Sequence, residues 1–485
     1  MQYDFGNIRE GLSADVIVVG GGPAGMCAAI AAAREGVSVL LVEQSGSCGG
    51  MATKGMVGPF MTCYDSKGEN MIIRGLFEEI VNRMVAKGFA IHPAEVRQGT
   101  GFTSWIKVGH DHVTPFEPEG LKLVIDEMLT EAGVKIMYHT NFLRCVMENN
   151  TITGILVSSK RGLERIDGKV IIDCTGDGDV AVTAGVPYEM GNEELGLIQP
   201  VTMFFHICNT DPEKMDADIQ ANIHNFFRKN GVNYRSFHWR VSEARENGDW
   251  EVDGVPFNRV ALGLFRMPKP DEWFVNVSRI VGINATDPES LTKAEIEGRK
   301  QADMILNMLR KYVPGCENAK MKGTGAQVGV RETRHIAGDY RLVADDLLNC
   351  VVPEDAVFLA ANSVDVHGRF GPASNEYTPI SGDYYGVFQS VEKAQLCWAF
   401  SVLCGIMNSG DVRCWNAEKW NEESLKSWTP KVWCLGRICC EKSMQQWILL
   451  RSTIWWSRCT AQTTAAPAWI RLFCSRWLLF SICMD

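Results

Sequence analysis

The sequence predicts an α/β protein with a three-layer, Rossmann-like domain, and two stretches near its start carry that prediction. The first, Val16-Ile-Val-Val-Gly-Gly-Gly-Pro-Ala-Gly25, joins a β-branched apolar run to a helical segment through a glycine turn. The second, Val37–Val42, is another apolar run and leads directly to Glu43. Short apolar runs that alternate with helices are typical of parallel strands buried on both faces of a sheet.

The glycine turn fits the pattern Gly-x-Gly-x-x-Gly. Gly20 permits a tight turn, Gly22 lets a pyrophosphate approach the backbone, and Gly25 lets the helix pack on the strand. Pro23 and Ala24 open that helix, whose first turn is a site for phosphate. A chance glycine turn in another α/β unit is the alternative interpretation. The strand, the glycines and the helix in this order favour dinucleotide binding.

The rest of this unit agrees with dinucleotide binding. We expect the strand over Asp15–Val19 and the helix over Pro23–Glu35, with Gly36 ending it in a left-handed conformation. Glu43 lies at the distance where a carboxylate would bind the ribose hydroxyls of a dinucleotide.

Composition excludes several classes of protein. The chain has 485 residues, of which 46% are hydrophobic and 22% charged, so it has room for two or three ordinary packed domains. A net charge of -10 without a basic stripe argues against a nucleic-acid partner. The polar start MQYDFGNIRE does not resemble a secretory signal, so we expect a cytoplasmic protein with no membrane partner. The oligomeric state is not readable.

A glycine-dense loop beyond Glu43 bears on which dinucleotide binds. Gly49 and Gly50 lie in the stretch Ser45–Gly55, where bare backbone can contact a flat ring, which an NAD-only fold hardly needs. We expect a helix over Glu119–Thr130 and a strand over Lys135–His139. A three-stranded meander should follow, with runs at Phe142–Met147, Ile152–Val157 and Val170–Asp173. It ends in Asp173-Cys-Thr-Gly-Asp-Gly-Asp179, either a cofactor-contacting turn or an acidic surface turn.

Together these motifs resemble the FAD-dependent oxidoreductase family that also contains heterodisulfide reductase A-like proteins. Further matching stretches are Phe116–Lys122, Ala294–Lys300, Val313–Gly315, Gly329–Gly338 and Val364–His367, and the resemblance runs from about Asp15 to about Val387. It implies a glutathione-reductase-like FAD domain built from discontinuous segments, with an inserted substrate or cap domain. On that basis residues 1–190 begin the FAD domain, 191–320 form the α+β cap domain, and 321–387 return to the FAD domain.

The resemblance also implies which residues bind the cofactor. Gly20, Gly22, Gly25 and Glu43 would hold the ADP half of FAD, while Gly49, Gly50 and Thr53 would line the isoalloxazine. Thr175, Gly176 and Asp177 would close over the diphosphate region. We place Cys145, in the first strand of the meander, with this cofactor-binding set. An iron–sulfur cluster is implied only through the heterodisulfide reductase relatives, and no cysteine motif for one is present.

The middle of the chain offers candidates for the chemistry. A helix is expected over Leu291–Tyr312, with an apolar face formed by Ile296, Ala302, Ile305, Leu306 and Leu309, and strands are expected over Pro200–Ile207 and Trp273–Val281. Arg331 and Arg334 would supply fixed positive charge to a substrate or flavin, unless they pair with neighbours such as Glu332 and Asp339. His367 is a candidate base, with a solvated loop histidine as the alternative.

Two other groups are weaker candidates. His110 and His112 could chelate a metal, but no third ligand lies near them, so no metal is predicted. Cys48 could be redox-active beside the flavin loop, although a small buried filler is the favoured interpretation because it has no paired cysteine.

The chain from 388 to 485 is compositionally different. It holds ten of the fourteen tryptophans and nine of the seventeen cysteines but three of the forty-six glycines. Glycine codons begin GG, so reading them one base out of phase after T gives TGG, the tryptophan codon. We therefore hypothesise a frameshifted tail, with a real Trp/Cys-rich accessory domain as the alternative.

Three functions follow from these patterns. The leading prediction is an FAD-dependent oxidoreductase that transfers a hydride between a small organic substrate and flavin. The alternatives are an electron-transfer flavoprotein of the heterodisulfide reductase A-like kind and an inactive, frameshifted product. No motif identifies the substrate or the electron acceptor.

Overall fold

The computed structural model describes residues 8–65, 68–106, 110–191, 198–225, 236–260 and 262–338, and three short strands between 407 and 433. Its largest sheet has the order β3-β2-β1-β6-β5-β4. β3, β2, β1 and β6 run parallel to one another, whereas β6, β5 and β4 form an antiparallel meander. The strands are β1 (Arg9–Val19), β2 (Val39–Val42), β3 (Lys135–Met137), β4 (Asn141–Glu148), β5 (Thr151–Ser159) and β6 (Gly162–Asp173).

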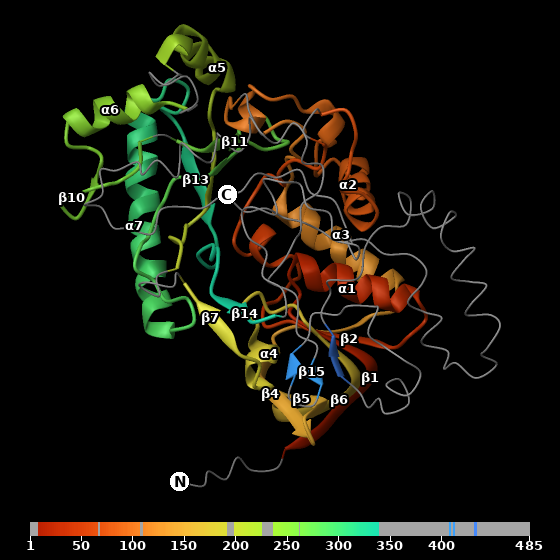
Figure 1. The fold of residues 1–485 in the computed structure, drawn as a ribbon. Coiled ribbons are helices and arrows are strands. Elements are labelled where there is room, and N and C mark those ends of the chain that lie inside the picture. Colours follow the sequence, from red (N-terminus) through yellow and green to blue (C-terminus); the bar gives the residue numbers. More distant parts are fainter. Residues whose placement is uncertain are drawn as a thin grey trace.

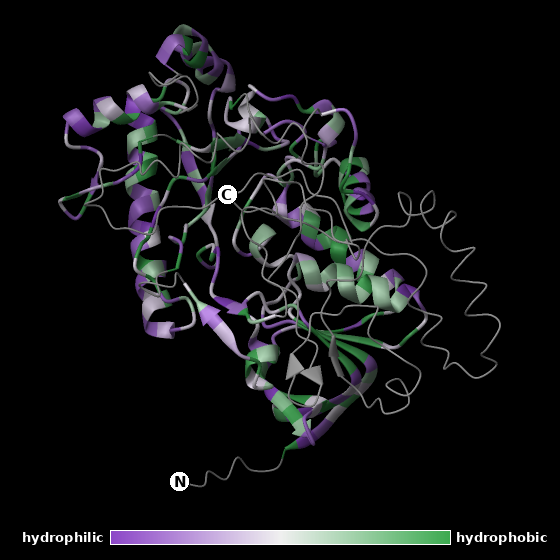
Figure 2. Cartoon of the chain, viewed as in Figure 1, coloured by the Kyte–Doolittle hydropathy of each residue, from purple (hydrophilic) through white to green (hydrophobic). Residues whose placement is uncertain are grey.

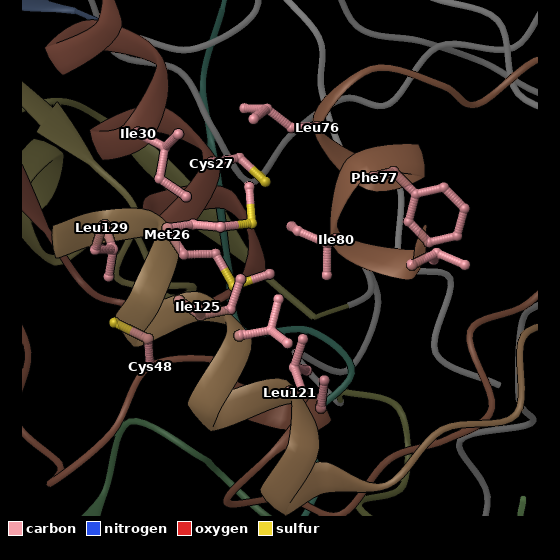
Figure 3. Packing of buried hydrophobic residues seen from close by; sticks show 14 of the residues in the cluster. Met26, Cys27, Ile30, Cys48, Leu76, Phe77, Ile80, Leu121, Ile125 and Leu129 are labelled. Atoms are coloured by element: carbon pink, nitrogen blue, oxygen red, sulfur yellow. The ribbon is translucent and has the colours of Figure 1, made fainter. Parts of the chain in front are cut away.

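α1 (Pro23–Arg34) and α3 (Pro118–Glu131) lie over one face of this sheet, and α2 (Leu76–Ala86) packs beside α3 (Figure 1). Met26 and Ile30 of α1 pack with Ile80 of α2 and with Leu121 and Ile125 of α3 in one buried cluster (Figure 3). The strands beneath them are strongly hydrophobic (Figure 2), as expected for strands buried on both faces.

The opposite face of the sheet has its own core. Ile17 and Leu40 point to this side and pack with Ile155 and Val157 of the meander and Val180 of α4 (Asp179–Thr183). Helices, sheet and this second layer make three layers, so the predicted Rossmann-like fold class is confirmed. β1 begins at Arg9, earlier than expected, because its first half pairs with the start of β6.

A second sheet has the order β11-β12-β8-β13, and all its pairs are antiparallel. The strands are β8 (Phe205–Cys208), β11 (Leu264–Arg266), β12 (Trp273–Val275) and β13 (Lys320–Thr324). One face packs against α7 (Pro288–Tyr312), with α5 (Pro212–Ala221) and α6 (His238–Glu246) beside it (Figure 1). The expected strands over Pro200–Ile207 and Trp273–Val281 are shorter, and one isolated bridge between Val201 and Ile280 continues their pairing.

The long helix α7 starts three residues before its expected start. The Asp287 carboxylate caps it by accepting hydrogen bonds from the amides of Glu289 and Ser290, and Pro288 is its first residue. The predicted apolar face was wrong at Ile296, whose side chain is 52% exposed. Ala294 and Gly298 are buried instead. Ile296 lies about 200° around the helix from each of them.

Short elements complete the described chain. They are the single-turn helices η1 (Gly50–Ala52), η2 (Pro93–Glu95), η3 (Gly101–Thr103) and η4 (Ile223–Asn225), and the strand pairs β7 (Tyr188–Met190) with β14 (Arg334–Ile336), β9 (Glu251–Val252) with β10 (Val255–Pro256), and β15 (Met407–Asn408) with β16 (Asp411–Val412). β17 (Lys431–Trp433) runs parallel to β6. Within the described ranges, none of the helices combines the length and apolar character needed to span a bilayer.

Candidate functional site

The glycine turn follows β1 and leads into α1. Gly20 has φ +96°, and a Cβ there would lie 2.3 Å from the Cys174 carbonyl oxygen. A Cβ at Gly25 would lie 1.8 Å from the Gly20 carbonyl oxygen, so these two glycines are required by chain packing. A Cβ at Gly22 would meet nothing within 4 Å. Space is therefore open in front of Gly22 at the N-terminus of α1, where Pro23 and Ala24 form the first turn.

Glu43 directly follows β2 and is only 4% exposed. Its Oε2 accepts a 2.6 Å hydrogen bond from the Gly21 amide, and its Oε1 accepts one of 2.7 Å from the Ser45 amide. The Lys54 ammonium lies 3.8 Å from Oε1. The carboxylate is thus fixed beside the glycine turn, with a positive charge at its second oxygen.

The Gly49–Gly50 loop packs on the same turn. The Gly49 amide donates a 2.8 Å hydrogen bond to the Gly21 carbonyl, and a Cβ at Gly50 would lie 2.9 Å from the Gly22 Cα. Gly49 has φ +104°, and the buried Thr53 hydroxyl donates to the Cys48 carbonyl at 2.8 Å. Two stretches that the sequence marked separately therefore meet at Gly21 and Gly22.

Cys48 is fully buried in the cluster beneath α1, α2 and α3 (Figure 3). Burial raises the pKa of its thiol to about 12. A thiol that stays neutral at physiological pH is a poor nucleophile. The environment therefore favours the buried filler over the redox-active thiol.

The Gly-Asp turn after β6 lies on the other side of Gly20. The Cys174 amide donates to the Val19 carbonyl at 2.8 Å, which joins this turn to the end of β1. The Asp173 carboxylate accepts hydrogen bonds from the Thr175 hydroxyl at 2.7 Å and the Ala181 amide at 3.0 Å. Burial raises the pKa of Asp173 despite these donors. Gly176 is exposed, with φ +87° and open space around it.

Arg334 braces this turn from a distant part of the chain. Its Nη1 donates to the Asp179 carboxylate at 2.6 Å and to the Asp177 carbonyl at 3.1 Å. The neighbouring Thr333 hydroxyl donates to the Asp177 carboxylate at 2.6 Å, while burial raises the pKa of Asp177. Sequence reasoning identified Arg334 but missed Thr333 and the pairing with Asp179, since no local spacing relates them.

The other predicted site residues lie elsewhere. Arg331 donates from Nη1 to the Pro200 carbonyl at 2.6 Å and the Thr202 hydroxyl at 2.8 Å, which ties the return segment to the chain entering β8. Cys145 is buried in the core of the meander, with its thiol 3.3 Å from the Val180 carbonyl. His367 lies outside the described residues.

His112, in the predicted His110–His112 pair, is held by packing and hydrogen-bond contacts within the fold. The His112 ring stacks on Tyr64 with centroids 3.9 Å apart, and its nitrogens lie 2.7 Å from Arg97 Nη1 and 2.9 Å from the Pro93 carbonyl. In the described part of the chain, no group of three or more His, Cys, Asp or Glu side chains could hold a metal ion. His112 therefore belongs to local packing.

Comparisons with known proteins identify the family. A family model described as FAD dependent oxidoreductase matches residues 15–388. A thiamine thiazole synthase of Methanococcus aeolicus is 26% identical over 39% of this chain and 64% of its own length. A dihydrolipoamide dehydrogenase of Chaetomium thermophilum is 26% identical over 50% of this chain and 49% of its own length. The chain thus covers less than two thirds of each relative.

Among solved structures, a geranylgeranyl bacteriochlorophyll reductase-like protein of Thermoplasma acidophilum is 13% identical, with 66% of each chain covered and a TM-score of 0.38. The flavin-dependent brominase Bmp2 is 15% identical, with 67% of this chain and 68% of that chain covered and the same TM-score of 0.38.

Proposed function

Because this chain belongs to the FAD dependent oxidoreductase family, we propose that it transfers a hydride between a small organic substrate and FAD. FAD is the cofactor of that family, and when bound it supplies the two-electron chemistry that side chains lack. The protein's part is to bind the cofactor, orient the substrate and exclude water.

The observation that carries this proposal is the meeting of three separate segments at one strand end. The Gly49–Gly50 loop contacts the glycine turn at Gly21 and Gly22, and the turn after Asp173 contacts it at Gly20. Of Gly20, Gly21 and Gly22, only Gly22 combines extended backbone with open space, and the free amides of α1 begin there. These residues fit a diphosphate, since an anion is stabilised by amides at a helix N-terminus.

The other residues have roles in this proposal that follow from their positions. Glu43 would accept hydrogen bonds from the ribose hydroxyls. Gly49, Gly50 and Thr53 would lie along the flat isoalloxazine ring system. Thr175, Gly176 and Asp177 would close over the diphosphate. The second sheet, backed by α7, would form the wall on the substrate side, and Arg331 would hold the segment that links this wall to the cofactor domain.

Anaerobic flavin bleaching tests the proposal. The chain is reconstituted with FAD and mixed, without oxygen, with a panel of alcohols, 2-hydroxy acids, amines and amino acids. Loss of the oxidised flavin absorbance with one class, and its return on adding oxygen or a quinone, is the expected result. If the flavin binds but no member of the panel reduces it, the result counts against hydride transfer from such substrates.

We also propose that the residues from about 388 result from translation out of frame. The family match ends at 388, where glycine becomes rare and tryptophan frequent, which supports this proposal. Such a chain would lack the last part of its FAD domain and would bind FAD weakly. Reading the coding DNA in all three frames tests it. The proposal fails if neither other frame encodes an apolar strand followed by a helix rich in small residues.

A further inference from the structure

One row of residues crosses the second sheet and faces the Rossmann-like domain. Phe265 pairs with Phe274, Phe274 pairs with His206, and His206 pairs with Gly323. Phe265 and Phe274 belong to the hydrophobic cluster that contains Met26 of α1. Because side chains alternate between the faces of a sheet, the whole row points toward the cofactor domain. The adjacent row packs on the other side, against α7.

The loop that carries Gly50 and Thr53 continues onto this row. A Cβ at Gly58 would lie 2.4 Å from the Phe274 ring, and a Cβ at Gly323 would lie 3.6 Å from the Met56 methyl group. His206 is therefore located where the second sheet meets the loop assigned to the flavin. Substrate must approach near this boundary if it is to react with a cofactor held by that loop.

The His206 ring is 3% exposed and packs edge-on against Phe274, with centroids 4.4 Å apart. Burial lowers its pKa to about 4, and the positive charge of Lys322 contributes, whereas a hydrogen bond to the Met56 backbone and the charge of Glu272 act in the opposite direction. The ring is therefore neutral at physiological pH.

Nε2 of His206 is buried and has no hydrogen-bond partner among the described residues. The Met56 backbone favours the protonated ring, as a carbonyl acceptor does. We therefore assign the proton of the neutral ring to Nδ1, which leaves Nε2 unprotonated. A neutral imidazole that donates from Nδ1 carries a lone pair on Nε2. A buried acceptor without a donor is an unfavourable arrangement that a bound ligand can relieve.

We propose that Nε2 of His206 accepts a hydrogen bond from a hydroxyl or N–H group of the substrate and thereby selects for substrates that carry one. This inference rests on the proposed function, since it presumes that substrate binds between the second sheet and the cofactor loop. A carboxylate oxygen cannot satisfy this position, because it has no proton to donate. The surrounding Phe265 and Phe274 rings suit the apolar part of such a molecule.

Nitrogen NMR of the full chain labelled with ¹⁵N-histidine tests the proposal without a known substrate. His206→Gln assigns the signals of the ring. At pH 7 we expect a protonated Nδ1 and an unprotonated Nε2, and we expect methanol, a small hydroxyl donor, to shift Nε2 saturably. Acetonitrile, which has no donor, should leave it unchanged. His112 serves as the internal control, because both its nitrogens have partners.

A protonated Nε2 at pH 7 overturns the proposal. The proposal also fails if Nε2 is unprotonated but its chemical shift does not change with methanol, or changes equally with acetonitrile. Nε2 would then not select for a hydroxyl donor. These results do not depend on flavin reduction, so they remain distinct from failure of the proposed function. Where a substrate bleaches the flavin, His206→Leu should raise its KM at least about 10-fold with unchanged FAD affinity, and His206→Gln should restore part of that loss.

Discussion

Gly20 and Cys174 are in backbone contact, and this contact joins the turn after β1 to the turn after β6. A Cβ at Gly20 would lie 2.3 Å from the Cys174 carbonyl oxygen, and the chain at Gly20 has φ +96°. Both the close approach and the left-handed backbone require glycine. The two turns that are assigned to the cofactor are thus held together by a position that tolerates no side chain.

Gly20→Ala should therefore destabilise the protein strongly. Backbone strain of about 1–3 kcal/mol and overpacking of about 1–3 kcal/mol give an expected loss of about 2–6 kcal/mol in the free energy of unfolding. Gly36→Ala is the matched control, because Gly36 has φ +83° with open space and so incurs only the strain. Urea unfolding of both variants measures the difference. Equal losses would show that the contact with Cys174 contributes nothing.

Gly22→Ala should separate cofactor binding from folding. Gly22 has extended backbone and open space, so we expect the free energy of unfolding without FAD to change by less than about 1 kcal/mol. The added methyl group would project toward the diphosphate and raise the FAD Kd at least about 10-fold, which corresponds to about 1.4 kcal/mol of binding free energy. Fluorescence titration with FAD measures this Kd. Unchanged affinity would mean that FAD does not approach Gly22.

Arg334→Gln should loosen the turn that closes over the diphosphate. It removes the 2.6 Å ion pair with Asp179 and the hydrogen bond to the Asp177 carbonyl. We expect the free energy of FAD binding to weaken by about 0.5–1.5 kcal/mol, which raises the FAD Kd about 2- to 10-fold. The effect is modest because the pair is partly exposed. Arg299→Gln is the control, since it breaks a 3.1 Å pair with Glu295 on α7 and makes no contact with the turn. If both variants bind FAD like the parent, the brace has no role in binding.

Cys48 should be chemically inert in the folded protein. Its pKa is raised to about 12, so the thiolate population becomes appreciable only as the pH approaches that value. We expect no alkylation of Cys48 by iodoacetamide between pH 7 and pH 9, and full alkylation in urea, as read by peptide mass spectrometry. Rapid labelling of the native protein at pH 7 would indicate a reactive thiol and revive a redox role.

The sequence predicted the parts of this site that local patterns encode. Strand, glycine turn and helix around Gly20 follow from residues that are neighbours in the chain, and so does the acid at Glu43. The brace from Arg334 to Asp179 could not be predicted, because it joins distant segments through tertiary packing. The same reason accounts for His206, a lone histidine in an apolar strand, and for Ile296, whose exposure depends on how α7 docks on the second sheet.

The glycine turn, the Gly49–Gly50 loop and the turn after Asp173 should together bind FAD, and the most direct test is an FAD titration of two chains side by side. One chain is the sequence as written, and the other carries the reading frame restored after about 388. We expect one FAD bound per restored chain and much weaker binding by the chain as written. A folded, restored chain that binds no FAD would contradict the assignment of the site. Full, tight binding by the chain as written would contradict the proposal that its residues from about 388 are out of frame.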